Sequence, residues 1–179
     1  AVVALLTRWA GRGAVGATGL GWPLAPHHRA YWWSAAVPLA ALVYGGAFVT
    51  ALGASGVTEP LPYVPLINPV DLSVLLALAA LLLWRRVLAA ADRPPAFAAT
   101  IAGNEGTVAL AALAFAAVNG AWLRTAHHWL GVHYSADTLG ASPVVQTGLA
   151  IIWTLLAMGL MLLAARKALR VVWIAGAGL

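Results

Sequence analysis

The sequence predicts an all-α fold, a polytopic bundle of transmembrane helices with four full spans and two partial ones. Hydrophobic residues make up 63% of the 179 residues and charged residues only 8%, against roughly 45–50% and about 25% in soluble domains. Four apolar stretches approach the roughly 20 residues that a helix needs to cross a bilayer. Because so few charges could not cover a soluble fold, lipid is the expected solvent.

The first part of the chain predicts a partial helix, a loop and one full span. The apolar run at 1–6 is expected to end a helix, and a loop rich in Gly and Pro follows at 11–26. The first span is expected at 33–54, with aromatic residues at its start, where such rings favour the membrane interface. A face of small residues on this span should let a neighbouring helix approach closely. This face comprises Ala41, Gly45, Gly46, Val49 and Thr50.

The second span is expected at 68–84, after a Pro-rich loop. Asn68 suits the N-cap, Pro69 the first helical position and Asp71 the first turn, where a negative charge is favourable. The pair of arginines that follows Trp84 is expected to end the helix at an interface.

The third span is expected at 106–128, or else begins at residue 96 and breaks at 103–106. The fourth span is expected at 143–165, with Ser142 as its N-cap. Both ends of the sequence lie in apolar runs, the last of which starts at 171. We therefore interpret residues 1–179 as a single transmembrane helical segment of a longer membrane protein.

The distribution of basic residues predicts the orientation of these spans. If the helices alternate in direction, nine of the ten lysines and arginines fall on one side and only Arg124 on the other. The nine are Arg8, Arg12, Arg29, Arg85, Arg86, Arg93, Arg166, Lys167 and Arg170. Because cytoplasmic loops carry an excess of Lys and Arg, the loops that bear these nine residues should be cytoplasmic, and the loop after the third span should face outward.

The most polar stretch lies at the outer end of the third span and holds the candidate site residues Arg124, His127, His128, His133 and Asp137. On a continuous helix Arg124 would face His127 and His128. Such a group could hold an anionic head group, relay protons or bind a metal, or it could be ordinary interfacial polarity. Neighbouring histidines point about 100° apart on a helix, so we expect no metal site and no cofactor.

Three further polar residues are secondary candidates. Glu105 would be functional if it lay deep in a helix that begins near residue 96, and would be a capping residue if the helix begins near Gly106. Asn119 is interpreted as a contact between helices. Gln146, at the start of the fourth span, could meet the histidine group or hydrogen-bond to another helix.

Several classes of function are excluded by absent motifs. The sequence has no cysteine, which excludes thiol catalysis and thiolate metal sites. It contains no phosphate-binding loop and no serine nucleophile elbow. The formal charge of +5 comes from basic residues at the ends of apolar runs. We therefore expect membrane lipids as partners, not nucleic acid.

Short motifs in the second half of the chain resemble one family of large bacterial membrane proteins, domain of unknown function 2339. They are Leu-Ile-Asn-Pro-Val-Asp-Leu at 66–72, Arg-Thr-Ala-His-His-Trp at 124–129, Gln-Thr-Gly-Leu-Ala-Ile-Ile-Trp-Thr at 146–154 and Arg-Lys-Ala-Leu-Arg-Val-Val-Trp-Ile-Ala-Gly at 166–176. The resemblance covers residues 68–179 well and the earlier part loosely.

This resemblance implies a late portion of a long chain in the bacterial inner membrane, with further transmembrane helices as partners. The family pattern continues past Leu179 into a Lys and Asp motif that this sequence lacks. The family brings no established activity, so the resemblance supports fold and location only.

Three classes of function stay open from the sequence. The first is an envelope enzyme that acts on a lipid-linked substrate at the outer face, with Arg124 holding a phosphate and a histidine or Asp137 as base. The others are a transporter or channel-like protein for a small solute and a structural or assembly protein. The first class is slightly favoured because the polar residues lie together at the outer end of the spans and do not continue across the bilayer.

Overall fold

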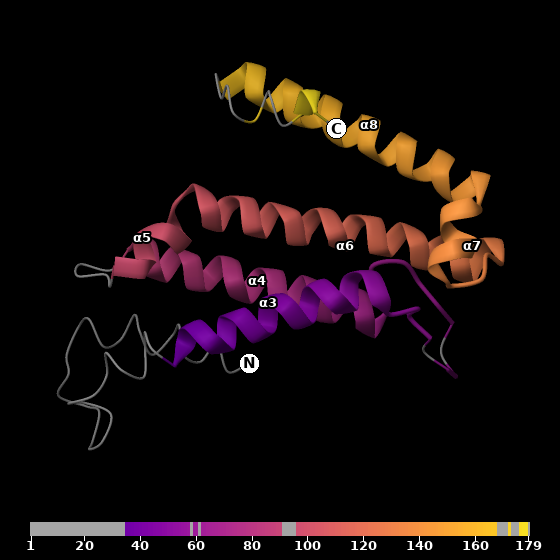
Figure 1. Cartoon of the computed structure of the whole chain (residues 1–179), viewed down its shortest axis with the longest axis horizontal. Coiled ribbons are helices and arrows are strands. Elements are labelled where there is room, and N and C mark those ends of the chain that lie inside the picture. The colour runs from indigo at the N-terminus through magenta and orange to yellow at the C-terminus, as the bar shows by residue number, and fades with distance from the viewer. Residues whose placement is uncertain are drawn as a thin grey trace. The chain divides into compact units, whose positions relative to one another are not determined.

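A computed structural model describes residues 35–57, 59–60, 62–90, 96–167, 172 and 176–178. These residues form six helices and no strand (Figure 1), which confirms the all-α class. The expected partial helix at 1–6, the loop at 11–26 and most of the expected helix from 171 lie outside the described residues.

Four of the six helices are long and apolar enough to cross a membrane, which confirms the four expected spans. In chain order and with the labels of Figure 1, the helices are α3 (Ala36–Gly53), α4 (Pro69–Ala89), α5 (Ala96–Ala102), α6 (Asn104–Leu130), α7 (Ala136–Ala141) and α8 (Pro143–Lys167). The spans are α3, α4, α6 and α8, and the short helices α5 and α7 lie before and after α6 in the chain.

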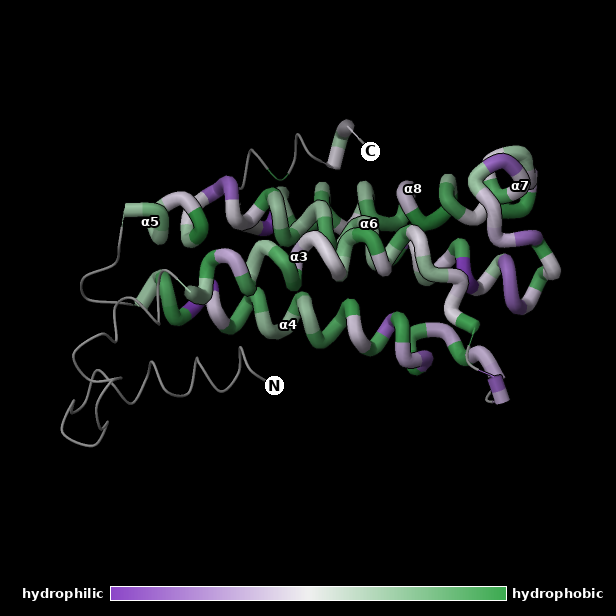
Figure 2. The backbone as a smooth tube through the Cα atoms, turned by 60° about the horizontal axis from the view of Figure 1, so that its bottom comes forward, coloured by the Kyte–Doolittle hydropathy of each residue, from purple (hydrophilic) through white to green (hydrophobic). Residues whose placement is uncertain are grey.

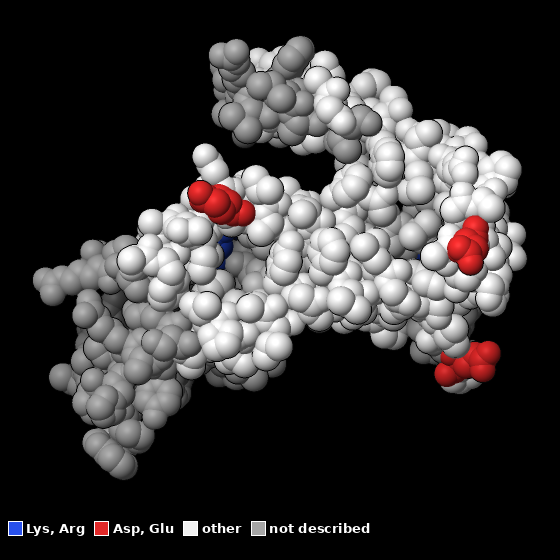
Figure 3. Space-filling view, viewed as in Figure 1, with Lys and Arg blue, Asp and Glu red and all other residues white. Residues whose placement is uncertain are grey.

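Apolar side chains cover the sides of the long helices. Only 11% of the most apolar part of α8 is buried, and Leu42 of α3 and Leu76 of α4 expose 72% and 70% of their surface. Figure 2 shows hydrophobic colour along the helices and hydrophilic colour mostly near their ends, and the face in Figure 3 is largely uncharged. Such surfaces are unfavourable in water and suit hydrocarbon, where helices satisfy their own backbone hydrogen bonds.

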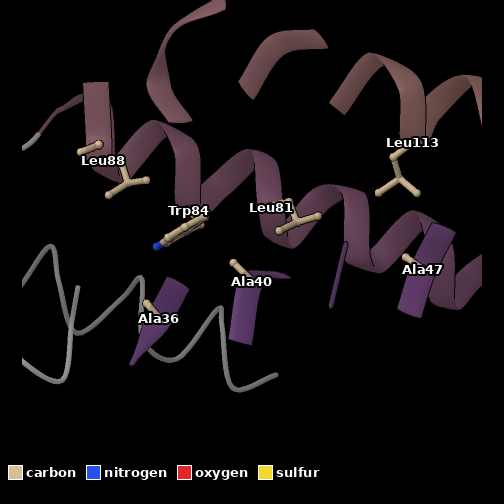
Figure 4. Packing of buried hydrophobic residues seen from close by; sticks show 8 residues of the cluster. Ala36, Ala40, Ala47, Leu81, Trp84, Leu88 and Leu113 are labelled. Atoms are coloured by element: carbon tan, nitrogen blue, oxygen red, sulfur yellow. The ribbon is translucent and has the colours of Figure 1, made fainter. Parts of the chain in front are cut away.

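The described residues belong to two compact units, Ala1–Gly120 and Ala121–Leu179, and α6 contributes to both. In the first unit, small residues of α3 pack against larger residues of α4. The cluster includes Ala36, Ala40 and Ala47 of α3, Leu81, Trp84 and Leu88 of α4, and Leu113 of α6 (Figure 4). Alanine allows the two helix backbones to approach closely, and the side chains of α4 then fill the space.

The expected contact face of α3 is not the face that packs among the described residues. A Cβ added at Gly45 or Gly46 would meet no atom of the described residues within 4 Å, and Val49 exposes 71% of its surface. Among the described residues, the alanine face packs instead. Because alanine and glycine are similarly small, the α3 sequence has two faces that suit close packing, and the large side chains of α4 decide between them.

The start of α4 is capped as predicted. The Asn68 side-chain oxygen accepts a hydrogen bond from the Asp71 N–H at 3.0 Å, and Pro69 occupies the first helical position. The Asp71 carboxylate in turn accepts from the Leu66 N–H at 3.0 Å and from the Asn68 side-chain amide. Both side chains are buried, so the cap joins the preceding loop to the helix.

The end of α4 differs from the prediction. The helix continues past Trp84 to Ala89, and Arg85 does not end it at an interface. The Arg85 side chain instead hydrogen-bonds to the end of α5 and to α6. The possible helix break is confirmed at Gly103, because α5 ends at Ala102, but it is shorter than predicted, since 104–106 already belong to α6.

In the second unit, α6, α7 and α8 meet around a small apolar core of Ala126, Leu139 and Val145. Trp122 of α6 reaches α8, where its Nε1 donates to the Val145 carbonyl at 3.1 Å. The indole lies so close to Gly148 that an added Cβ would stand 2.0 Å from a ring carbon. This tryptophan therefore helps to fix where α8 starts relative to the end of α6.

Candidate functional site

The candidate site is built on the end of α6 and the turn that follows it. Helix α6 ends at Leu130, and Gly131 adopts the left-handed conformation with φ +71°, which glycine accepts without steric strain. The Val132 N–H then donates back to the Ala126 carbonyl at 3.3 Å. The chain therefore reverses here and returns along the last turn of α6.

This reversal separates the predicted site residues. Arg124, His127 and His128 share α6, as expected for a continuous helix. His133 lies in the loop, and Asp137 lies in the first turn of α7. The spacing of four between these last two residues therefore does not place them on one helical face.

His127 is the best defined member of the group. Its Nδ1 lies 2.8 Å from the Val132 carbonyl oxygen. A carbonyl oxygen can only accept a hydrogen bond, so Nδ1 must carry a proton. In the neutral ring the lone pair then belongs to Nε2, which is the tautomer that a backbone carbonyl commonly selects.

Two aromatic rings flank His127. The His128 ring meets it edge to face, with ring centroids 4.6 Å apart, and the Tyr134 ring does the same at 5.5 Å. Tyr134 was missing from the residues proposed from the sequence. A tyrosine placed shortly after a helix-ending Gly131 could have suggested that its ring returns to the last turn of the helix.

Arg124 is set apart from this group by its burial. Its side chain has no exposed surface, and it is the largest fully buried side chain among the described residues. A substrate outside the protein could reach Arg124 only if packed side chains moved.

His133 and Asp137 are exposed on the loop and on α7. Helix α7 was not predicted. Ser135 caps it, accepting from the Thr138 N–H at 3.3 Å, and Asp137 in the first turn adds a favourable charge. A capping serine followed by an acid in the first turn was the available signal, but six residues are too few to show helical periodicity.

The described residues contain no group of three or more His, Cys, Asp or Glu side chains that could hold a metal ion. The side chains at this end of the second unit offer imidazole, phenol and carboxylate groups. These groups can donate and accept hydrogen bonds and can transfer protons.

Two of the secondary candidates, Asn119 and Gln146, have hydrogen-bond partners close by. Glu105 is exposed in the first turn of α6, at the opposite end of the helix from the histidines. The Asn119 amide donates to the Phe115 carbonyl of its own helix at 2.7 Å. Gln146 donates to the Gly140 carbonyl of α7 at 2.6 Å, which is the hydrogen bond between helices that the sequence left open.

Comparison with known proteins gives one match. The sequence matches the family described as Predicted membrane protein (DUF2339) over residues 1–179, including the part before residue 68 where the resemblance was loose. No curated protein and no solved structure matches the chain. The four apolar spans agree with that description, and the chain belongs to the DUF2339 family of membrane proteins.

Proposed function

We propose that this chain is a segment of a bacterial inner-membrane protein that acts on a lipid-linked or other envelope substrate at its outer face. The observation that carries the proposal is the His127 ring, whose Nδ1 is committed to the Val132 carbonyl. This bond leaves Nε2 to face a substrate, as the acceptor of a proton or, when protonated, as a donor to an anionic group.

The proposed orientation rests on the charges. Arg85 and Arg86 lie in the last turns of α4 and Arg166 at the end of α8, whereas Arg124 lies toward the histidine end of α6. Because cytoplasmic loops carry an excess of basic residues, the histidine end of α6 faces outward in this proposal. The exposed Trp129 beside the histidines suits the interface with lipid head groups.

Each side chain has a distinct part in this proposal. His127 is the proton acceptor, and the half-buried His128 and exposed His133 donate hydrogen bonds to a phosphate. Asp137 is an exposed carboxylate that can accept from a substrate hydroxyl. Full burial of Arg124 argues against the direct phosphate contact expected from the sequence.

A transporter has less support, because a path across the membrane needs polar residues along its length. Helix α3 contains no charged residue, and in α8 the charged residues are confined to its last turn. The exposed apolar sides of α8 suit lipid and the remaining helices of the same full-length protein, which we propose as the partners of this segment.

The test uses two isosteric replacements of His127 in the protein reconstituted in phosphatidylcholine nanodiscs. Asparagine can keep a donor near the position of Nδ1 and removes Nε2, whereas glutamine places an amide near Nε2 and loses the Nδ1 donor. The probe is a fluorescent long-chain polyprenyl monophosphate. Ser73→Ala is the control, because this exposed hydroxyl donates to the Val70 carbonyl of its own helix and, within the described part of the chain, to nothing else.

We expect His127→Asn to fold normally and to bind the probe at least about tenfold more weakly, which corresponds to about 1.4 kcal/mol. That loss is what one hydrogen bond to a charged group contributes. His133→Ala should also weaken binding, and the Ser73 variant should not. No binding to the unaltered protein, or equal binding by His127→Asn, would overturn the proposal.

A further inference from the structure

The side chain of Arg85 is held by oxygen atoms at the break between α5 and α6. Its Nε donates to the Ile101 carbonyl at 3.2 Å. Its Nη2 donates to the carbonyls of Ala102 and Gly103, at 2.8 and 3.2 Å, and to the Thr107 hydroxyl at 2.6 Å. One guanidinium is therefore held by four oxygen atoms, with the two hydrogens of Nη2 shared among three of them.

These oxygens form a set of acceptors that suits a cation. The last carbonyls of a helix have no partner within the helix, and its C-terminal end carries a partial negative charge. The Thr107 hydroxyl donates its own proton to the Gly103 carbonyl at 3.0 Å, so it presents a lone pair to Arg85. The Gly103 carbonyl also accepts from the Thr107 N–H at 3.2 Å, so Arg85 shares this oxygen with α6.

The backbone at the break is packed tightly enough to hold these oxygens in place. A Cβ added at Gly106 would stand 1.8 Å from the Ile101 carbonyl oxygen, and one at Gly103 would stand 2.8 Å from the Ala99 carbonyl oxygen. Both glycines therefore allow a close approach of backbone to backbone that no other residue would permit.

The next arginine in the chain provides a contrast. Arg86 is exposed, and its side chain makes no hydrogen bond to any residue that the structure describes. Two adjacent arginines at the same end of α4 thus have different surroundings. Charge at the membrane surface accounts for Arg86 but not for the four directed bonds of Arg85.

We propose that the break between α5 and α6 is a binding site for a guanidinium cation, which the chain fills with its own Arg85. Occupancy of this site holds α5 against α4, where Ala98 and Leu88 are each only 1% exposed. The planar guanidinium reaches several acceptors at once, whereas the point charge of a lysine ammonium cannot match all of them.

The test measures how often α5 leaves α4. Because the chain has no cysteine, a single Ala98→Cys substitution reports the opening of α5 through its rate of alkylation by N-ethylmaleimide. We expect Arg85→Ala to raise that rate at least about tenfold in the full chain in nanodiscs. Millimolar guanidinium chloride should restore the slow rate by entering the vacated site, and equal sodium chloride should not.

Three controls separate this account from a general loss of structure. Arg86→Ala should leave the rate unchanged, Arg85→Lys should behave like Arg85→Ala without rescue by added salt, and Cys at the exposed Ala99 should react fast in every background. An unchanged rate in Arg85→Ala, or equal effects of the two salts, would overturn the proposal. If Arg85→Ala does not accumulate, Thr107→Val must still raise the rate several-fold, and an unchanged rate there would also refute it.

Discussion

Gly106, in the first turn of α6, is the position where one added methyl group should do most harm. A Cβ there would stand 1.8 Å from the Ile101 carbonyl oxygen and 2.7 Å from its carbonyl carbon. Real Cβ atoms essentially never approach closer than 3.0 Å. Because the obstacle is backbone and not the tip of a flexible side chain, α5 or the start of α6 must move.

The magnitude follows from two opposing effects. Alanine in place of glycine within a helix stabilises by roughly 0.5–1 kcal/mol, whereas forcing extra atoms into a packed site destabilises by typically about 1–3 kcal/mol. Gly45 of α3 provides the matched control, because its added Cβ would meet no described atom within 4 Å. The gain from replacing glycine by alanine in a helix is common to both variants. The difference between their free energies of unfolding therefore isolates the strain at the break, about 2 kcal/mol.

The assay is thermal unfolding in detergent, followed by the fluorescence of the tryptophans. For a chain of this size about 2 kcal/mol corresponds to roughly 4–8 °C. Gly106→Ala should therefore melt several degrees below Gly45→Ala, which should equal or exceed the unaltered protein. Equal melting temperatures for the two variants would refute the close backbone approach at the break.

Two further substitutions test the rest of the structure by the same thermal assay. Gly148→Ala would bring a Cβ to 2.0 Å from the Trp122 ring, so the indole must leave its 3.1 Å bond to the Val145 carbonyl. The free energy of unfolding should fall by about 1–3 kcal/mol. A melting temperature at or above that of the unaltered protein would contradict this packing. Asn68→Ala removes the cap of α4 and leaves the buried Asp71 N–H without its 3.0 Å partner. The free energy of unfolding should therefore fall by about 1–2 kcal/mol. An unchanged melting temperature would mean that the cap is not formed.

Local signals in the sequence predicted the spans well. Asn68 and Pro69 at the start of α4, and Ser142 before α8, stand where helix-capping preferences place them. A run of apolar residues long enough to cross a bilayer is also a property of the sequence alone. These features need no knowledge of which helix packs against which.

The misses involve contacts between segments that are distant in the chain. Arg85 resembles an ordinary interfacial arginine in sequence, and only the fold brings the carbonyls that follow Ile101 to its side chain. The packed face of α3 depends on the large residues of α4.

At the candidate site, the sequence identified a polar stretch but could not predict the arrangement of the residues within it. Gly131 turns the chain back, so His127 meets the Val132 carbonyl and the Tyr134 ring and does not form a row with His133. The burial of Arg124 likewise depends on packing that no local pattern encodes.

The most direct test of the whole account is which side of the membrane each end of the spans reaches. Single cysteines at the exposed Ala136, at the start of α7, and at the exposed Ala90, just after α4, can be probed with a membrane-impermeant maleimide on spheroplasts. We predict that Cys at position 136 reacts in intact spheroplasts and that Cys at position 90 reacts only after permeabilisation. The reverse pattern would contradict the outward placement of the histidines, and recovery of the protein from the soluble fraction would contradict the membrane spans themselves.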